Sequence, residues 1–199
     1  MASIGLRKPY YAIYSNTKGT VTYEKGGILA KAIEFSAKIE GGKDENLYAD
    51  DGISETDRTF SGGTISITTD DLTGEASCAI LGITAKTITV GENKEVKEIV
   101  YDDNMVPPYI GFGVIIPKKR NGIVCYRAVV LEKIMFDIPE ESAKTKSDKI
   151  EWGIPKIDGT VLRSDATGHP WKREVTVDTE ELAEAYIKQC LNITEIPIV

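Results

Sequence analysis

The chain has 199 residues, with 24 Lys and Arg against 31 Asp and Glu, one histidine and a net charge of −7. This length accommodates one good-sized hydrophobic core, so we expect a single domain over residues 1–199. The negative charge disfavours a protein that grips nucleic-acid phosphates, and a single histidine excludes a multi-histidine metal site. No stretch approaches the roughly 18 apolar residues of a membrane span, and no apolar signal segment opens the sequence, so we expect no membrane partner.

The cysteines, Cys78, Cys125 and Cys190, are odd in number and far apart, and none forms a C-x-x-C pair. Such a set predicts neither a disulfide framework nor a zinc site. We expect three reduced, buried thiols in a reducing compartment.

Short runs rich in Val, Ile, Thr, Tyr and Phe, separated by Gly, Pro and Asn, predict a mainly β protein, a sandwich or barrel, with two helices. Residues 32–40, AIEFSAKIE, and residues 62–71, GGTISITTDD, alternate between apolar and polar side chains, which predicts strands with one wet face. The expected apolar faces hold Ile33, Phe35, Ala37 and Ile39 in the first strand and Ile65 and Ile67 in the second. The expected wet faces hold Glu34, Ser36, Lys38 and Glu40 in the first and Thr64, Ser66 and Thr68 in the second.

Between these strands, residues 41–63 predict a long polar loop that contains LYADDG. Tyr48-Ala49-Asp50-Asp51 has the form of the Y-x-D-D box with which palm-type polymerases hold two metal ions. The chain supplies no phosphate loop and no further acidic constellation to complete such a site, whereas Asp-Gly between extended segments is ordinary turn chemistry. The turn interpretation is favoured, and a metal-dependent nucleotidyl-transfer enzyme using Asp50 and Asp51 remains an alternative.

Further along the chain, residues 70–81 predict a short helix capped by Asp70 or Asp71, with a stripe of Leu72, Ala76, Ala79 and Ile80 and a stop at Gly82. Residues 86–90 and 94–101 predict a charged, exposed hairpin. Residues 109–136 predict a long hairpin that turns at Asn121-Gly122 and whose second arm is covered on both faces. Residues 177–191 predict a C-terminal helix with Asp178 and Glu181 at its start and a buried stripe of Leu182, Ala185, Tyr186 and Cys190.

The tryptophans give no exposed cluster of the kind that binds carbohydrate, since Trp152 lies in an alternating strand and Trp171 lies beside a proline turn. This disfavours a monomeric receptor-binding β domain. His169 lies in the turn-like segment SDATGHPW, which predicts that it is a loop residue.

Seven motifs in order, IGLRKPYYA, LYADDG, GGTISITTDDL, AILG, PPYIGFG, the run from KIMFDIPEE to KIDGTV, and HPWK, resemble the major tail protein family of long, non-contractile-tailed bacteriophages. The resemblance spans residues 4–191. It implies a sandwich-like, barrel-like tail tube subunit without catalytic activity or cofactor, which assembles six to a ring and stacks into a tube through which viral DNA passes. It also implies a virion protein made in the host cytoplasm, whose partners are other copies of itself and the tape measure, tail terminator and baseplate proteins.

The resemblance implies an N-terminal arm over residues 1–9, and together with the residue patterns it gives roles to two sets of candidate residues. The inter-subunit contact loop holds Leu47, Tyr48, Asp50, Asp51, Ile53 and Phe60, an apolar minority within a polar segment that needs a surface to cover. The lumen candidates are the wet-face residues Glu34, Ser36, Lys38, Glu40, Thr64, Ser66 and Thr68. A negative lumen would let DNA slide, because cationic walls hold phosphates through counterion release. The inner tube of a phage-derived particle, such as a tail-like bacteriocin or gene-transfer agent, is an alternative within the same class.

Overall fold

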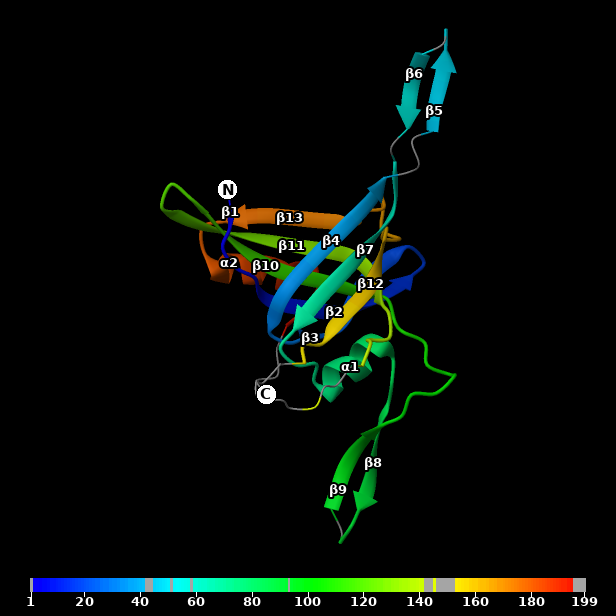
Figure 1. Ribbon diagram of the computed structural model, residues 1–199, viewed down its shortest axis with the longest axis vertical. Helices are drawn as coiled ribbons and strands as arrows, with labels where there is room; N and C mark the ends of the chain where they lie inside the picture. The colour runs from blue at the N-terminus through cyan, green and yellow to red at the C-terminus, as the bar shows by residue number, and fades with distance from the viewer. Residues whose placement is uncertain are drawn as a thin grey trace.

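The protein is a mainly β structure built on a nine-stranded antiparallel sheet, with two further hairpins, a short internal helix and a C-terminal helix (Figure 1). The computed structural model describes residues 2–41, 45–50, 52–57, 59–92, 94–141, 145 and 153–194, and gives only the backbone for strands β5 and β6 and for residue 120. The expected fold class is confirmed.

The strands are β1 (Ala2–Ser3), β2 (Arg7–Thr17), β3 (Thr20–Ile28), β4 (Ala32–Gly41), β5 (Glu45–Ala49), β6 (Gly52–Asp57), β7 (Phe60–Thr69), β8 (Ala85–Val90), β9 (Lys94–Ile99), β10 (Ile110–Arg120), β11 (Ile123–Phe136), β12 (Lys156–Leu162) and β13 (Lys172–Val177). The helices are α1 (Gly74–Leu81) and α2 (Glu180–Cys190). The main sheet has the order β3-β2-β10-β11-β12-β7-β4, and β1 pairs with β10 and β13 with β11.

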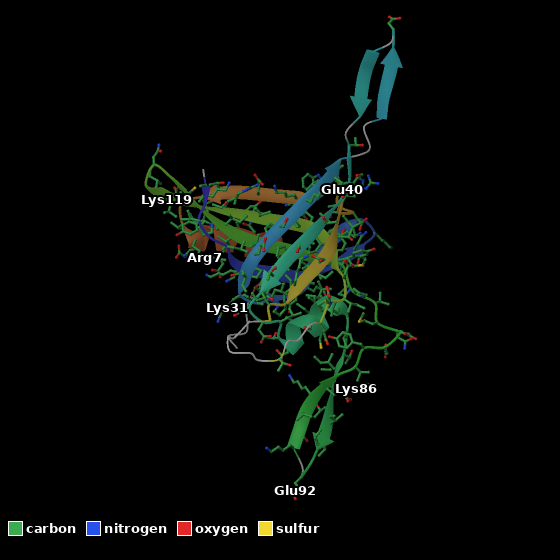
Figure 2. The ribbon with its side chains drawn as sticks, viewed as in Figure 1. Arg7, Lys31, Glu40, Lys86, Glu92 and Lys119 are labelled. Atoms are coloured by element: carbon green, nitrogen blue, oxygen red, sulfur yellow. The ribbon has the colours of Figure 1, made fainter. Side chains whose placement is uncertain are left out.

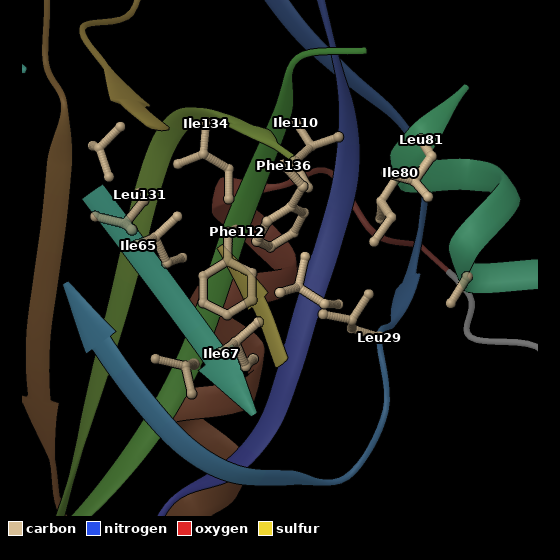
Figure 3. Close-up of a cluster of buried hydrophobic side chains, with 14 of the residues drawn as sticks. Leu29, Ile65, Ile67, Ile80, Leu81, Ile110, Phe112, Leu131, Ile134 and Phe136 are labelled. Carbon is tan, nitrogen blue, oxygen red and sulfur yellow. The ribbon is translucent and has the colours of Figure 1, made fainter. Parts of the chain in front are cut away.

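The sheet folds over on itself into two layers. Strands β4, β7 and β12 lie across the front of β2, β10 and β11 in Figure 1, and a shared apolar core fills the space between them. The ring of Phe35 on β4 stacks on that of Phe112 on β10 with 5.8 Å between centroids, and Phe136 on β11 meets Phe112 edge-on (Figure 3). Ile65 and Ile67 of β7 point into this core, as their alternation predicts.

Strand β11 is covered on both faces, as its two apolar faces predict. Val129 and Leu131 enter the core between the layers, whereas Ala128 and Val130 enter a second apolar cluster beneath α2. The edge of β11 opposite β10 pairs first with β13 and then, beyond residue 132, with β12. The long hairpin of β10 and β11 turns at Asn121 and Gly122, whose φ angles of 51° and 82° suit a two-residue turn.

Helix α2 rests directly on the backbone of β10. A Cβ atom at Gly113 would lie 2.4 Å from Cγ2 of Ile187, and one at Gly111 would lie 2.5 Å from Cδ2 of Leu191. The Gly-Phe-Gly run therefore serves close packing between a helix and a strand. The predicted stripe is partly right: Tyr186 and Cys190 pack against the second apolar cluster, but the buried residues of the helix are Ala183 and Ile187, and Leu182 is 56% exposed.

The ends of both helices differ from expectation in the capping residue. The side chain of Thr73, not that of Asp70 or Asp71, accepts a hydrogen bond from the backbone N–H of Ala76 at the start of α1. At the start of α2 the side chain of Thr179 accepts from the N–H of Leu182, so the predicted pair of Asp178 and Glu181 does not form the cap. Asp70 instead accepts a hydrogen bond from the backbone N–H of Lys31.

The two segments expected to be an arm and a loop both contain strands among their described residues. In the N-terminal segment, β1 pairs with residues 118 and 119 of β10, and β2 begins at Arg7, so the described residues of this segment lie on their own subunit. Within 41–63, the described residues include the end of β4, the hairpin of β5 and β6, and the start of β7. This hairpin stands clear of the two layers at one end of the longest axis, and the hairpin of β8 and β9 projects at the other end (Figure 1).

Candidate assembly surfaces

The predicted wet faces of β4 and β7 form one continuous polar face. The two strands pair so that Glu34 lies opposite Thr68, Ser36 opposite Ser66, and Lys38 opposite Thr64. Paired residues share a face of a sheet, so the six side chains lie together in three rows. Glu40 continues β4 beyond these rows, opposite Gly62, and is labelled in Figure 2.

Strand β12 widens this face, which sequence analysis did not foresee. Lys156 pairs with Thr68, Asp158 with Ser66, and Thr160 with Thr64, while Ile157 and Val161 alternate with them into the core. The β12 sequence KIDGTVL has the same period-2 signal, but its glycine weakens the pattern. We call the set Glu34, Ser36, Lys38, Glu40, Thr64, Ser66, Thr68, Lys156, Asp158 and Thr160 the polar face.

The charges of the polar face nearly balance. It carries three acids and two lysines, and Lys156 Nζ lies 3.2 Å from Asp158 Oδ2. A hydrogen bond from Ser66, and then Lys156, lower the pKa of the Asp158 carboxyl below its usual range, so that acid stays ionised at neutral pH. A polyanion would meet alternating charges and hydroxyls here and no cationic cluster.

No described element covers the polar face, in contrast to the opposite side of the molecule, which α2 covers (Figure 1). The outer edge of β4 also has no partner strand within the described ranges, because β4 ends the sheet. A bulge near the start of β4 shifts the register from Ala32 opposite Thr69 to Glu34 opposite Thr68. Ile33, expected on the apolar face, is the extra residue and is 51% exposed.

The candidate contact loop divides into two parts. Phe60 lies in β7, where its ring stacks on Trp171 of its own subunit at 5.0 Å between centroids, and its contact with another subunit stays a prediction. Leu47, Tyr48 and Ile53 lie in the hairpin of β5 and β6, with Tyr48 paired opposite Ile53. Their contact with another subunit stays a prediction.

Asp50, the described member of the carboxylate pair, lies at the tip of this hairpin. Asp50 is exposed with a φ of 49°, between Ala49 and Gly52, which pair with each other, so the predicted turn is confirmed. Asp51 and Trp152 lie outside the described residues. Within the described part of the chain, no three His, Cys, Asp or Glu side chains come together in a group that could hold a metal ion.

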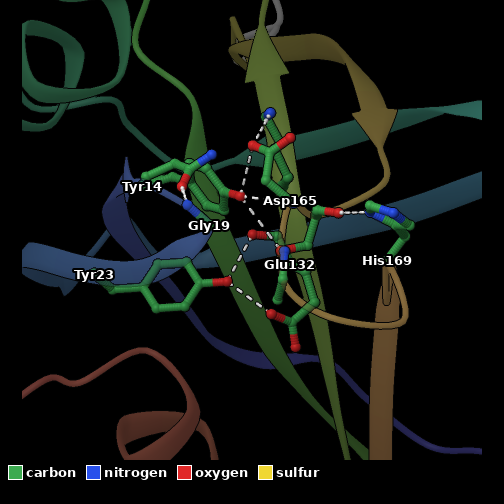
Figure 4. A network of polar contacts seen from close by, with 10 residues as sticks. Tyr14, Gly19, Tyr23, Glu132, Asp165 and His169 are labelled. Carbon is green, nitrogen blue, oxygen red and sulfur yellow. Dashed lines mark hydrogen bonds and ion pairs between the residues drawn. The ribbon is translucent and has the colours of Figure 1, made fainter.

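A buried polar network, absent from the sequence predictions, links β2, β3, β11 and the segment before β13 (Figure 4). The hydroxyl of Tyr23 donates to both the backbone oxygen and Oε2 of Glu132 at 2.8 Å, and Arg173 forms an ion pair with Oε1. Burial, followed by the hydrogen bond to Glu132, raises the pKa of Tyr23 well above its usual value. The hydrophobic pattern of β11 does not indicate that Glu132 is buried and paired, because the pattern reports only the apolar residues on either side of it.

A second part of the network surrounds Lys133. Its Nζ lies 2.7 Å from Asp165 Oδ2 and 5.0 and 4.4 Å from the ring centroids of Tyr14 and Tyr109. The hydrogen bonds from Lys133 and Tyr14 lower the pKa of Asp165. His169 lies in the predicted loop, with Nδ1 3.0 Å from the backbone oxygen of Ser164. These contacts fix the loop before β13 against the sheet.

No protein-family model matches this chain, and comparison with curated proteins finds no relative. None of the helices in the described ranges has the length and apolar character that crossing a membrane requires.

Proposed function

We propose that this chain is the structural subunit of a bacteriophage tail tube, which assembles as stacked hexameric rings around a channel for DNA. The polar face carries the proposal: three adjacent strands present a broad set of polar side chains on one side, and the described elements leave that side uncovered. The wall of a water-filled channel requires one broad sheet face that stays polar and open, and these strands supply such a face.

The edge of β4 supports the same proposal. A ten-residue edge strand without proline is a template for pairing with another chain. Closure of several subunits into a ring would pair such edges and remove the hazard. In that ring the polar face would line the channel, and its balanced charge would let DNA move past without the counterion release that makes cationic surfaces bind.

The hairpin of β5 and β6 is the proposed contact between subunits. A two-stranded hairpin that stands clear of its own domain is marginal alone and gains stability from a surface on a neighbour. Repetition of one modest contact around a ring and along a tube would give a stable assembly.

The first experiment is electron microscopy of the purified chain in negative stain, in which we expect rings and tubes. A protein that stays monomeric at every concentration and salt condition tested would overturn the proposal.

A second experiment replaces residues 43–58 by a short Gly-Ser bridge. Because Gly41 pairs opposite Phe60, a bridge of a few residues can join the two strands without disturbing the sheet. We expect native-like circular dichroism and no tubes. The Leu47→Ala and Tyr48→Ala double variant should likewise fold and form no tubes. The control, Leu182→Ala, truncates an exposed leucine on α2 and should assemble normally. Normal tubes from the bridged chain would remove the hairpin from the proposal.

A third experiment tests the channel face. The Ser36→Cys and Thr64→Cys variants should react with a bulky maleimide as subunits and be protected in assembled tubes, because both side chains are exposed on the polar face. Ala185→Cys, exposed on α2, is the matched control for the opposite side. Free reaction of positions 36 and 64 in the tube would place the polar face outside.

A further inference from the structure

The hairpin of β8 and β9 has one face that its own subunit leaves open. Pairing places Ile88 opposite Val96, Val90 opposite Lys94, and Lys86 opposite Glu98 on this face. Val90 and Val96 are 51% and 41% exposed. On the other face, Lys97 Nζ bonds to Oε1 of Glu75 on α1 at 2.7 Å, which fixes the orientation of the hairpin against the body.

The outer edge of β9 has no partner strand in the described part of the chain, because β8 and β9 form a two-stranded sheet of their own. Two strands with no covering layer are marginally stable in water, and a third or fourth strand stabilises them. An edge of this kind is normally protected by charge, and β9 carries alternating signs in the run Lys94-Glu95-Val96-Lys97-Glu98.

This run is complementary to itself. When two copies lie antiparallel with Val96 opposite Val96 of the second copy, Lys94 faces Glu98 and Glu95 faces Lys97 at every position. Shifting the register by one residue in either direction places Glu95 against Glu98 or Lys94 against Lys97. Shifting it by two places Glu95 against itself or Lys97 against itself. Only one register of the five pairs each charge with its opposite.

We propose that two copies of this chain associate through β9, edge to edge and antiparallel about Val96, to form a four-stranded sheet in the order β8-β9-β9-β8. Its open face would carry one central apolar row of Ile88, Val96, Val96 and Ile88, flanked by rows in which Lys94 meets Glu98 of the other copy. The interface is small, so the dimer is weak and forms at high protein concentration.

This proposal does not depend on the tail tube. A two-fold contact closes with two copies and cannot extend a tube by itself. It therefore belongs to the unassembled subunit, where it covers an edge that would otherwise be open to indiscriminate pairing.

The test is sedimentation velocity of the full chain over a range of concentrations, which resolves monomer, dimer and larger assemblies. We expect a reversible dimer in the unassembled fraction. Lys94→Glu places two pairs of like charges across the two-fold axis of the dimer, and Glu98→Lys does the same. Each variant should weaken self-association by about tenfold or more. Equal mixing of the two variants restores opposite charges at both positions and should restore the dimer.

The mixing experiment separates the proposed register from a general effect of charge, and circular dichroism of each variant confirms folding. A wild type that stays monomeric to millimolar concentration, or a mixture that dimerises no better than its components, would overturn the proposal.

Cross-linking gives a second readout. A Val96→Cys variant places two thiols opposite each other on the two-fold, within the reach of a disulfide. The control, Val90→Cys, lies on β8 and is at least as exposed, but three strand spacings, about 14 Å, separate β8 from its counterpart. Under mild oxidation we expect a covalent dimer from the first variant and none from the second. Equal yields from both would refute the register.

Discussion

Removal of Arg173 should destabilise the protein more than neutralisation of its buried partner, although Arg173 is the more exposed of the two. The side chain of Glu132 is 4% exposed and that of Arg173 is 50% exposed. Arg173→Ala leaves the carboxylate buried with only the Tyr23 hydroxyl, which it shares with a backbone oxygen. Breaking a buried ion pair in this way costs about 3 kcal/mol, whereas Glu132→Gln, which keeps an acceptor for Tyr23, costs about 1 to 2 kcal/mol.

The double variant provides the decisive comparison. Adding Glu132→Gln to Arg173→Ala removes the unpaired charge without leaving a cavity, so the double variant should be more stable than Arg173→Ala alone by about 1 kcal/mol or more. Urea unfolding followed by far-UV circular dichroism measures the four free energies. Additive losses in the double variant would refute this account of Glu132.

Three further predictions concern the packing and the N-terminal strand. Gly113→Ala should destabilise the protein by about 1 to 3 kcal/mol, because its Cβ would lie 2.4 Å from Ile187, while Gly5→Ala, with 3.9 Å to Pro117, should be neutral in the same urea assay. Phe60→Ala should lower the free energy of unfolding by about 1 to 2 kcal/mol through loss of the stack on Trp171, and an unchanged midpoint would contradict the assignment of Phe60 to its own subunit. Burial raises the pKa of Glu184, but hydrogen bonds from Lys188 and Lys8 outweigh it and lower the value from 4.5 to about 2. The stabilisation is therefore present above pH 4.5 and lost as the pH falls towards 2. Glu184→Gln should cost about 1 to 2 kcal/mol at pH 7, reduced by the exposure of Lys8, and almost nothing near pH 2 in acid titrations of unfolding.

Period-2 alternation predicted the strands well where the ladder is regular and failed where it is not. Ile65 and Ile67 are buried as expected, because β7 pairs without interruption with both neighbours over these residues. Ile33 fits the same pattern and is exposed, because the bulge inserts it between two ladder pairs. A bulge depends on the register in which two strands pair, and the sequence of β4 alone does not predict it.

The stripe of α2 shows a different limit. Leu182 and Ala183 are adjacent, and a pattern built on Leu182, Ala185 and Tyr186 is as apolar as one built on Ala183 and Ile187. The surface of β10 determines which face of the helix is buried, because two glycines there allow Ile187 and Leu191 to pack directly against the strand backbone. These glycines are visible in the sequence, but their meaning depends on which helix lies over them. The partner of Glu132 is similarly distant in sequence, since Arg173 follows 41 residues later in β13.

The candidate residues on β4 and β7 could be grouped before the fold was known because side-chain alternation is local, whereas their union with β12 depends on long-range pairing. The molecule therefore has two different exposed surfaces, the polar face of β4, β7 and β12 and the open face of β8 and β9. The polar face has no apolar row, so its burial against protein would strand hydroxyls and charges without partners, which is costly. The open face of β8 and β9 has an apolar row between charged rows, so contact with protein would remove apolar area and pair the charges. We therefore expect water against the first surface in every assembled state, whereas contact with protein is favourable at the second.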